Sequence, residues 1–197
     1  MSIPDRDNPI DLFKEWFYEA RQSDLISEPT AMTVATVDEH GMPWARIVLM
    51  KDVSDAGFTF FTNLASRKAV HLHANPKAGL CFHWMDIDKQ VRVQGRVTQV
   101  DDDQADAYFE TRPRESQIGA WASVQSATLS GRAELEGRFQ EFSAKFEGKE
   151  VPRPEFWSGF CLSPDVIEFW LRAPFRLHDR RIYRRAANAW TSELLYP

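Results

Sequence analysis

Residues 90–100 of the chain, QVRVQGRVTQV, alternate apolar and polar side chains. Val91, Val93 and Val97 occupy one set of alternate positions, whereas Arg92 and Arg96 occupy the other. Because successive side chains of a β-strand point to opposite faces of a sheet, this pattern predicts a strand with one buried face. We therefore expect a protein whose core is built on a sheet.

Other β-rich runs lie on both sides of this strand. They cover residues 31–37, 44–51, 57–62, 78–85, 159–163, 166–171, 178–184 and 190–195. Residues 38–41, DEHG, separate the first two runs and predict a hairpin turn. The runs are spaced as hairpins and do not alternate regularly with helices. This spacing favours a mainly β antiparallel barrel with helical insertions over a doubly wound sheet.

Helices are expected between some of these strands. Asn8-Pro9 opens an amphipathic helix that reaches about residue 22. Asn63 can cap a second helix, and Asp101 with Gln104 has the spacing of a capping box at the start of a third. The second to fifth helices are predicted over residues 64–74, 101–112, 116–121 and 130–146.

Length and composition limit the class of protein. The 197 residues fit a single domain, residues 1–197, in which residues 1–8 are expected to form a flexible arm. No run is apolar enough to span a membrane, and the N-terminus lacks a signal-peptide core. A net charge of −5 argues against non-specific nucleic-acid binding. Cys81 and Cys161 fit no metal-binding pattern. We expect a cytoplasmic protein without a metal site, a nucleic-acid partner or a membrane.

Residues 108–126, YFETRPRESQIGAWASVQS, hold one candidate anion site. Tyr108 and Arg112, four residues apart, would share a helical face, and the turn at Pro113 can bring Ser116 back toward them. A hydroxyl, a guanidinium and a phenol near a helix N-terminus suit a phosphate. The alternative is a solvated helix face with a capping serine.

A second candidate anion site is formed by Ser66, Arg67 and Lys68 in the first turns of a predicted helix. Two cations at a helix N-terminus are unfavourable unless an anion compensates for them. Arg46 and Lys51, five residues apart, would point to opposite faces of a regular strand unless a bulge intervenes. Taken by themselves, they are more simply explained as ordinary charges at a strand end.

Arg176, His178 and Arg180 alternate with other residues, so a regular strand would place all three on one face. A histidine such as His178 can act on a proton, although a structural role is equally open. The sequence contains no nucleophile elbow and no paired metal-binding histidines. Many anion-binding groups without acid–base machinery indicate that a cofactor supplies the chemistry.

Several of these segments together resemble the pyridoxamine 5′-phosphate oxidases, which are FMN-dependent enzymes that make pyridoxal 5′-phosphate. The resemblance covers about residues 9–197. The motifs occur in order along the chain: RIVLMK (46–51), FTN (61–63), SRK (66–68), RPRESQIGAW (112–121), SVQS (123–126), FWSG (156–159), IEFW (167–170) and RLHDR (176–180). Phe61 departs from the family pattern, because a tyrosine is usual there.

The resemblance implies a split β-barrel homodimer with FMN at the subunit interface, in which residues 127–197 include the dimerisation region. FMN is expected to contact Arg46, Ile47, Val48, Leu49, Met50, Lys51, Phe61, Thr62, Arg67, Lys68, Gln90, Gln125, Ser126, Trp170 and Arg180. The substrate is expected to contact Lys51, Tyr108, Arg112, Ser116, Arg176, Leu177 and His178. Arg176 and His178 would lie against the pyridine ring as the catalytic residues.

The implied reaction belongs to vitamin B6 biosynthesis or salvage. Hydride passes from C4′ of pyridoxamine or pyridoxine 5′-phosphate to flavin N5, and dioxygen then reoxidises the flavin to give hydrogen peroxide. The amine substrate also releases ammonia. Two alternatives are a flavin or pyridoxal-phosphate carrier without turnover and a split-barrel flavin reductase with another substrate. The carrier would not need Arg176 and His178, and the reductase would have no evident use for Tyr108, Arg112 and Ser116.

Overall fold

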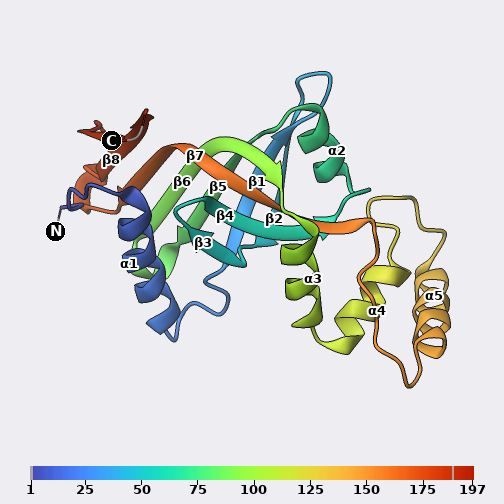
Figure 1. Ribbon diagram of the computed structural model, residues 1–197. Coiled ribbons are helices and arrows are strands. Elements are labelled where there is room, and N and C mark those ends of the chain that lie inside the picture. Colours follow the sequence, from blue (N-terminus) through green and yellow to red (C-terminus); the bar gives the residue numbers. More distant parts are fainter. Residues whose placement is uncertain (1, 188) are drawn as a thin grey trace.

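The strands form one antiparallel sheet that curls into a half-barrel (Figure 1). The computed structural model describes residues 2–187 and 189–197, and within these ranges the sheet has nine strands. They are β1 (Ala31–Val37), β2 (Pro43–Leu49), β3 (Asp52–Ser54), β4 (Gly57–Asn63), β5 (Lys77–Trp84), β6 (Lys89–Gln99), β7 (Trp157–Leu171), β8 (Asp179–Ala186) and β9 (Ala189–Leu194). The strand order is β2-β1-β5-β6-β7-β4-β3, with β8 and β9 continuing from β7. The predicted mainly β split barrel is confirmed.

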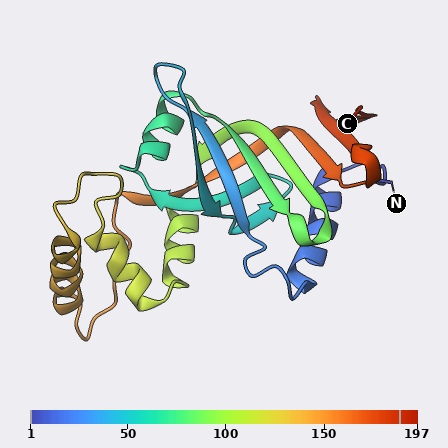
Figure 2. The same ribbon diagram turned by 180° about the vertical axis from the view of Figure 1, so that it is seen from behind.

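Helices are inserted at both ends of this sheet. They are α1 (Pro9–Gln22), α2 (Arg67–Ala74), α3 (Asp102–Glu110), α4 (Arg114–Ala122) and α5 (Arg132–Lys145), with short 3-10 turns η1 (Met85–Ile87) and η2 (Pro174–Arg176). Figures 1 and 2 show α1 and both termini at one end of the molecule and α3, α4 and α5 at the other. Among the described residues, no helix combines the length and apolar character needed to cross a membrane.

Strand β6 lies between β5 and β7 and has the burial pattern that its alternation predicts. Its register against β7 shifts between Gln94 and Gly95. A Cβ atom on Gly95 would lie 2.0 Å from the Ser163 carbonyl oxygen, so only glycine fits this approach. Residues 159–163 and 166–171, predicted as two strands, are therefore one strand, because the irregularity near Pro164 bends β7 without ending its pairing.

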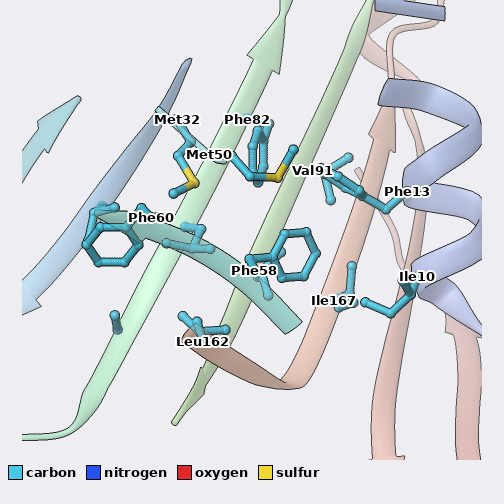
Figure 3. Close-up of a cluster of buried hydrophobic side chains, with 14 of the residues drawn as sticks. Ile10, Phe13, Met32, Met50, Phe58, Phe60, Phe82, Val91, Leu162 and Ile167 are labelled. Carbon is cyan, nitrogen blue, oxygen red and sulfur yellow. The ribbon is translucent and has the colours of Figure 1, made fainter. Parts of the chain in front are cut away.

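The main core fills the inside of the half-barrel. Phe13 of α1 packs edge-on against Phe58 of β4 and Phe82 of β5, with ring centroids 4.8 and 4.9 Å apart (Figure 3). A second, smaller apolar cluster joins α3, α4 and the segment after α5 to Trp157 at the start of β7. This second cluster attaches the helical insertion to the sheet.

The N-terminal segment, expected to be a flexible arm, packs against β8 and β9. Ile3 is buried in the main core. The Tyr183 hydroxyl accepts a hydrogen bond from the Arg6 N–H at 3.1 Å, and Asp5 forms an ion pair with Arg181 at 2.9 Å. The apolar Ile3 side chain and the charge of Asp5 thus both find partners on the barrel.

Two predicted helix boundaries were wrong. Ser66, rather than Asn63, is the N-cap residue of α2, because Asn63 still belongs to β4 and its side chain instead accepts the Ala65 N–H at 2.8 Å. Helix α3 ends at Glu110, so Arg112 lies in the turn before α4 instead of on the helix. Asp101 caps α3 as predicted, accepting the Gln104 N–H at 2.8 Å.

Candidate functional site

A cavity of about 1120 Å³, called the main cavity below, lies between β2, β4, the start of α2 and the segment from α3 to residue 126. Most of the predicted ligand-binding residues line it. Those predicted for the cofactor are Arg46, Ile47, Val48, Leu49, Lys51, Phe61, Thr62, Arg67, Lys68, Gln125 and Ser126. Those predicted for the substrate phosphate are Lys51, Tyr108, Arg112 and Ser116.

Arg46, Arg67 and Lys68, called the cationic group below, share one wall of this cavity. Among the described residues, none of the three forms an ion pair with a carboxylate. The Lys68 ammonium donates to three neutral acceptors, Thr62 Oγ1 at 2.7 Å, Gln125 Oε1 at 2.9 Å and Ser66 Oγ at 3.0 Å. Within the described residues, no carboxylate neutralises the positive charges of this wall, so they are available to an anionic ligand.

Burial and mutual repulsion lower the pKa values of two members of the cationic group. Burial, followed by the charge of Arg46, lowers the pKa of Lys68 to about 8. Burial, followed by the charge of Arg67, lowers the pKa of Arg46. Both lowered pKa values mean that keeping Lys68 and Arg46 protonated costs free energy. A bound anion would reduce this cost.

The loop after α4 completes this wall from a distant part of the sequence. Ser126, whose φ is 72°, accepts the Arg67 backbone N–H through its hydroxyl at 3.2 Å. Gln125 accepts from Lys68 and from the Thr62 hydroxyl. The predicted pair Gln125-Ser126 is therefore placed on the N-terminal turn of α2, where free backbone N–H groups favour an anion.

Arg112 lies on another wall of the same cavity. Its guanidinium stacks over the rings of Trp157 and Phe109, with the central carbon 4.7 and 5.4 Å from the ring centroids. Arg112 Nη1 is buried and has no hydrogen-bond partner among the described residues. Burial lowers the pKa of Arg112, partly offset by Tyr108. A buried donor of this kind is costly, and an anion would satisfy it.

Tyr108 and Ser116 accompany Arg112. The Tyr108 ring stacks on Phe61, with centroids 4.1 Å apart and an angle of 19° between the rings. Phe61 stacks in turn on Trp157 at 5.5 Å. Ser116 lies in the first turn of α4. The phenylalanine at position 61 thus keeps the stacking surface that orients Tyr108, without a hydroxyl of its own.

Arg46 and Lys51 line the same cavity, contrary to the opposite faces expected for a regular strand. The reason is that β2 ends at Leu49 and Lys51 lies in the short connection to β3. Met50, predicted to contact the cofactor, does not line the cavity, and its side chain is 3% exposed within the main core (Figure 3).

The other predicted residues lie elsewhere. A second cavity of about 620 Å³ is lined by Trp170, Arg176 and His178 among others. Trp170 lies near one end of β7, whereas Trp157, which lines the main cavity, lies at the other. Gln90 pairs with Trp170 across β6 and β7, and Arg180 pairs with Trp170 across β7 and β8, so these three form one row in the sheet.

The prediction that Arg176, His178 and Arg180 share one strand face was wrong. Strand β8 begins only at Asp179. Arg176 lies in the η2 turn with a φ of 62°, next to Phe175 with a φ of 59°. Left-handed backbone at two consecutive non-glycine residues breaks the alternation that the strand prediction assumed. Leu177 is 67% exposed and lines neither cavity.

His178 and Arg180 are held by contacts within the chain. His178 Nδ1 accepts the Ala173 N–H at 3.2 Å, and its ring lies 4.6 Å from that of Trp170. Arg180 donates to Glu168 Oε1 at 2.9 Å and to the Tyr196 carbonyl at 2.8 Å. The turn and the strand that follow β7 are therefore both oriented before any ligand binds.

Some cavity residues were not predicted from the sequence. Trp44, Asn63, Thr111, Ser123 and Trp157 also line the main cavity. Trp44 precedes Arg46 by two residues and therefore shares its strand face, which was the available signal. Trp157 belonged to a motif of the resemblance, but nothing in its local sequence distinguished a cavity wall from core.

The chain is similar to known proteins over nearly its whole length. Residues 19–146 match the family model described as pyridoxamine 5′-phosphate oxidase, and residues 157–197 match the pyridoxine 5′-phosphate oxidase C-terminal dimerisation region. A Rhodospirillum rubrum protein named pyridoxine/pyridoxamine 5′-phosphate oxidase is 51% identical and covers 100% of this chain and 99% of its own. A Cupriavidus necator protein of the same name is 55% identical over 90% of this chain and 82% of its own.

One solved structure is similar to this chain in both fold and sequence. PhzG from Burkholderia lata, determined in complex with tetrahydrophenazine-1-carboxylic acid, superposes with a TM-score of 0.92 and 29% identity over 98% of this chain and 94% of its own. The two family models, the relatives that are about 50% identical and this structure all indicate the same family, in sequence and in fold. The chain belongs to the pyridoxine/pyridoxamine 5′-phosphate oxidase family.

Proposed function

We propose that the protein is an FMN-dependent oxidase that converts pyridoxamine and pyridoxine 5′-phosphate to pyridoxal 5′-phosphate, with dioxygen as the electron acceptor. The observation that carries the proposal is that one cavity holds two separate sets of cations without carboxylate partners among the described residues. Two phosphate esters, one of the cofactor and one of the substrate, would satisfy both sets.

The cationic group fits the phosphate of FMN. Arg46, Arg67 and Lys68 surround the start of α2, where backbone N–H groups also favour an anion. Gln125 and Ser126 close this part of the cavity from the other side. Bound FMN would supply the hydride acceptor and its reoxidation by dioxygen, and these residues would bind and orient it.

Arg112, Tyr108 and Ser116 fit the substrate phosphate, with Lys51 nearby on the cavity wall. Arg112 Nη1, which no described residue contacts by a hydrogen bond, and two hydroxyl groups supply donors suited to phosphate oxygens. Anchoring the ester would fix the distance between the substrate ring and the flavin. Orientation of this kind can lower a reaction barrier by several kcal/mol, up to about 11 when the bound geometry is close to that of the reaction.

Arg176 and His178 would act from the partner subunit of a homodimer. Residues 157–197 match the family's dimerisation region, which includes the turn that carries both. Because His178 Nδ1 accepts a backbone N–H, a neutral His178 ring carries its proton on Nε2. That proton is then available to a substrate oxygen or nitrogen, while Arg176 would stabilise negative charge on the pyridine ring. Leu177, Gln90, Trp170 and Arg180 would complete the same half of the site.

The reaction balances with water and dioxygen. Two electrons and two protons leave the C4′ carbon and its substituent, and dioxygen accepts them to give hydrogen peroxide. The amine substrate then loses ammonia by hydrolysis, whereas the alcohol gives the aldehyde directly. In this scheme the chain itself binds both esters and aligns them, and the Nε2–H of His178 would orient the C4′ substituent by a hydrogen bond without a net transfer of its proton.

The test is an anaerobic titration of the purified, flavin-loaded protein with each phosphorylated vitamer. We expect the flavin absorbance near 450 nm to bleach with pyridoxamine or pyridoxine 5′-phosphate, and air to restore it with release of hydrogen peroxide. A flavin that stays oxidised with both compounds would contradict the proposal. Bleaching only by a reduced nicotinamide would favour a flavin reductase, and no bleaching by any donor would favour a carrier.

FMN affinity should fall at alkaline pH because of Lys68. The pKa of Lys68 is about 8, below its usual value of 10.5, so the ammonium loses its proton above that pH in the FMN-free protein. Binding a phosphate dianion would then require proton uptake. We expect the Kd of FMN to rise with pH above about 8, by at most about tenfold per unit. Fluorescence titrations at pH 7, 8 and 9 measure this.

Lys68→Arg is the matched control for this pH dependence, because a guanidinium stays protonated throughout the range. Its FMN affinity is expected to change little between pH 7 and pH 9. An equally steep pH dependence in Lys68→Arg would assign the effect to another group.

A further inference from the structure

A buried polar pair lies behind the cationic group. Thr36 on β1 is 1% exposed, and His71 on α2 is 6% exposed. Thr36 Oγ1 and His71 Nδ1 are 3.0 Å apart. Neither residue lines the main cavity, so the proposed function gives them no direct contact with a ligand. A histidine buried against a threonine hydroxyl nevertheless costs free energy unless its hydrogen bond is used.

The pair is connected to the cavity through Arg46. Arg46 Nη1 donates to Thr36 Oγ1 at 2.7 Å and to the carbonyl oxygens of Val34 and Trp44 at 3.1 and 3.2 Å. All three bonds fall on one nitrogen, and Thr36 is the only side chain among these acceptors. Among the described residues, Arg46 Nε and Nη2 have no such bond, so they remain for a ligand in the cavity that Arg46 lines.

The donors and acceptors of these hydrogen bonds determine the orientation of the Thr36 hydroxyl. Its oxygen accepts from Arg46, so its own hydrogen is free to donate to His71 Nδ1. A neutral His71 ring with its proton on Nε2 matches this arrangement. The hydroxyl therefore has one donor and one acceptor partner, and its rotation about the side-chain bond is restricted by both.

The same pair ties α2 to the sheet. His71 lies one turn after Arg67 and Lys68 on α2, whereas Arg46 lies on β2. Trp44, two residues before Arg46, packs its ring 5.9 Å from His71 and 4.6 Å from the Arg67 guanidinium. The positive charges of Arg46 and Arg67 repel each other, so other contacts must hold β2 and α2 at a fixed distance.

We propose that Thr36 and His71 are positioning residues that set the spacing of the cationic group for a phosphate monoester. This inference rests on the proposed function, since it takes the FMN phosphate as that ester. The hydrogen bond from Thr36 to His71 orients the acceptor that holds Arg46, and it joins the strand that carries Arg46 to the helix that carries Arg67 and Lys68. The positioning residues act through Arg46 and do not touch the ligand.

The test compares binding of FMN and of riboflavin, which lacks the phosphate, to the FMN-free protein. Thr36→Val keeps the side-chain shape but removes the hydroxyl, and His71→Leu removes the same hydrogen bond from the other side. Each is expected to weaken FMN binding about tenfold, while riboflavin affinity changes less than about twofold. The double variant should also lose only about tenfold, because both substitutions break one link.

Two conservative variants are the controls. Thr36→Ser keeps the hydroxyl, and His71→Asn offers an amide oxygen near the position of Nδ1. Both are expected to bind FMN within about threefold of the unchanged protein, as rescue of one hydrogen bond requires. Melting temperatures measured in parallel show whether each variant is folded, and His71→Leu serves if Thr36→Val does not fold.

The outcomes separate the two proposals. If the unchanged protein does not prefer FMN to riboflavin, the phosphate assignment fails, and the positioning role fails with it. If it does prefer FMN and the folded Thr36→Val and His71→Leu variants keep that preference, only the positioning role is overturned. Equal weakening of FMN and riboflavin in these variants would also overturn it, because that result indicates a general structural role.

Discussion

Replacing Arg112 with alanine is expected to raise the KM for pyridoxamine 5′-phosphate by about 100-fold, with the FMN content of the purified protein unchanged. Arg112 Nη1 is buried and has no partner in the described part of the chain, so its hydrogen-bonding capacity is available to the substrate phosphate. Stacking on Trp157 holds the guanidinium in place without a competing carboxylate. Steady-state kinetics and the ratio of flavin to protein absorbance measure the two quantities.

Arg114→Ala provides a matched control for this prediction. Arg114 lies two residues away, but its guanidinium donates to the carbonyl oxygens of Lys149 and Phe146 and does not line the main cavity. Its loss should lower the melting temperature and leave the KM unchanged. A large increase of the KM in Arg114→Ala would mean that the helical insertion, rather than the Arg112 charge, determines substrate affinity.

Replacing Arg67 with alanine is expected to weaken FMN binding about 30-fold, while the KM for pyridoxamine 5′-phosphate at saturating FMN stays nearly constant. Arg67 belongs to the cationic group, and its guanidinium stacks over Trp44 at the cavity wall. The alanine variant keeps the backbone N–H that donates to Ser126, so the start of α2 stays in place. Titration of the FMN-free protein with FMN measures the change.

The control for Arg67 is Arg185→Ala. Arg185 also stacks over a tryptophan, Trp190, at the same 4.6 Å, but it lies on the β8–β9 hairpin and away from the main cavity. Its loss should leave FMN affinity unchanged. If Arg67→Ala and Arg112→Ala reduced flavin content equally, the two sets of cations would have been assigned to the wrong esters.

Strands were the most predictable part of the fold. The β-rich runs located β1, β4 and β5, and alternation with a period of two located β6, each to within a residue or so. Helix starts were predictable where a cap was unambiguous, as at Asn8 and Asp101. They failed at α2, because Asn63 can form the same short-range hydrogen bond at the end of a strand.

Alternation was a poor guide where the backbone leaves the regular strand conformation. The positive φ angles at Phe175 and Arg176 place the arginine in a turn. Nothing in the composition of residues 174–178 predicts these angles. The bend in β7 at Pro164 is tolerated because Gly95 opposite it has no side chain, so the strand continues where a break was predicted. At Pro164, a local pattern was overridden by the close approach of a residue distant in sequence, Gly95.

Sequence alone determined which residues could hold anions and the order of the strands along the chain, because charge type and side-chain period are properties of the sequence itself. Only the tertiary structure decided that segments around residues 46, 67, 112 and 126 share one cavity, whereas Arg176 and His178 line another. It also showed Thr36 and His71 behind Arg46. The reason is that strand pairing and the packing of helices on the sheet bring together residues that are distant in sequence. These contacts decide which unpaired charges lie close to one another.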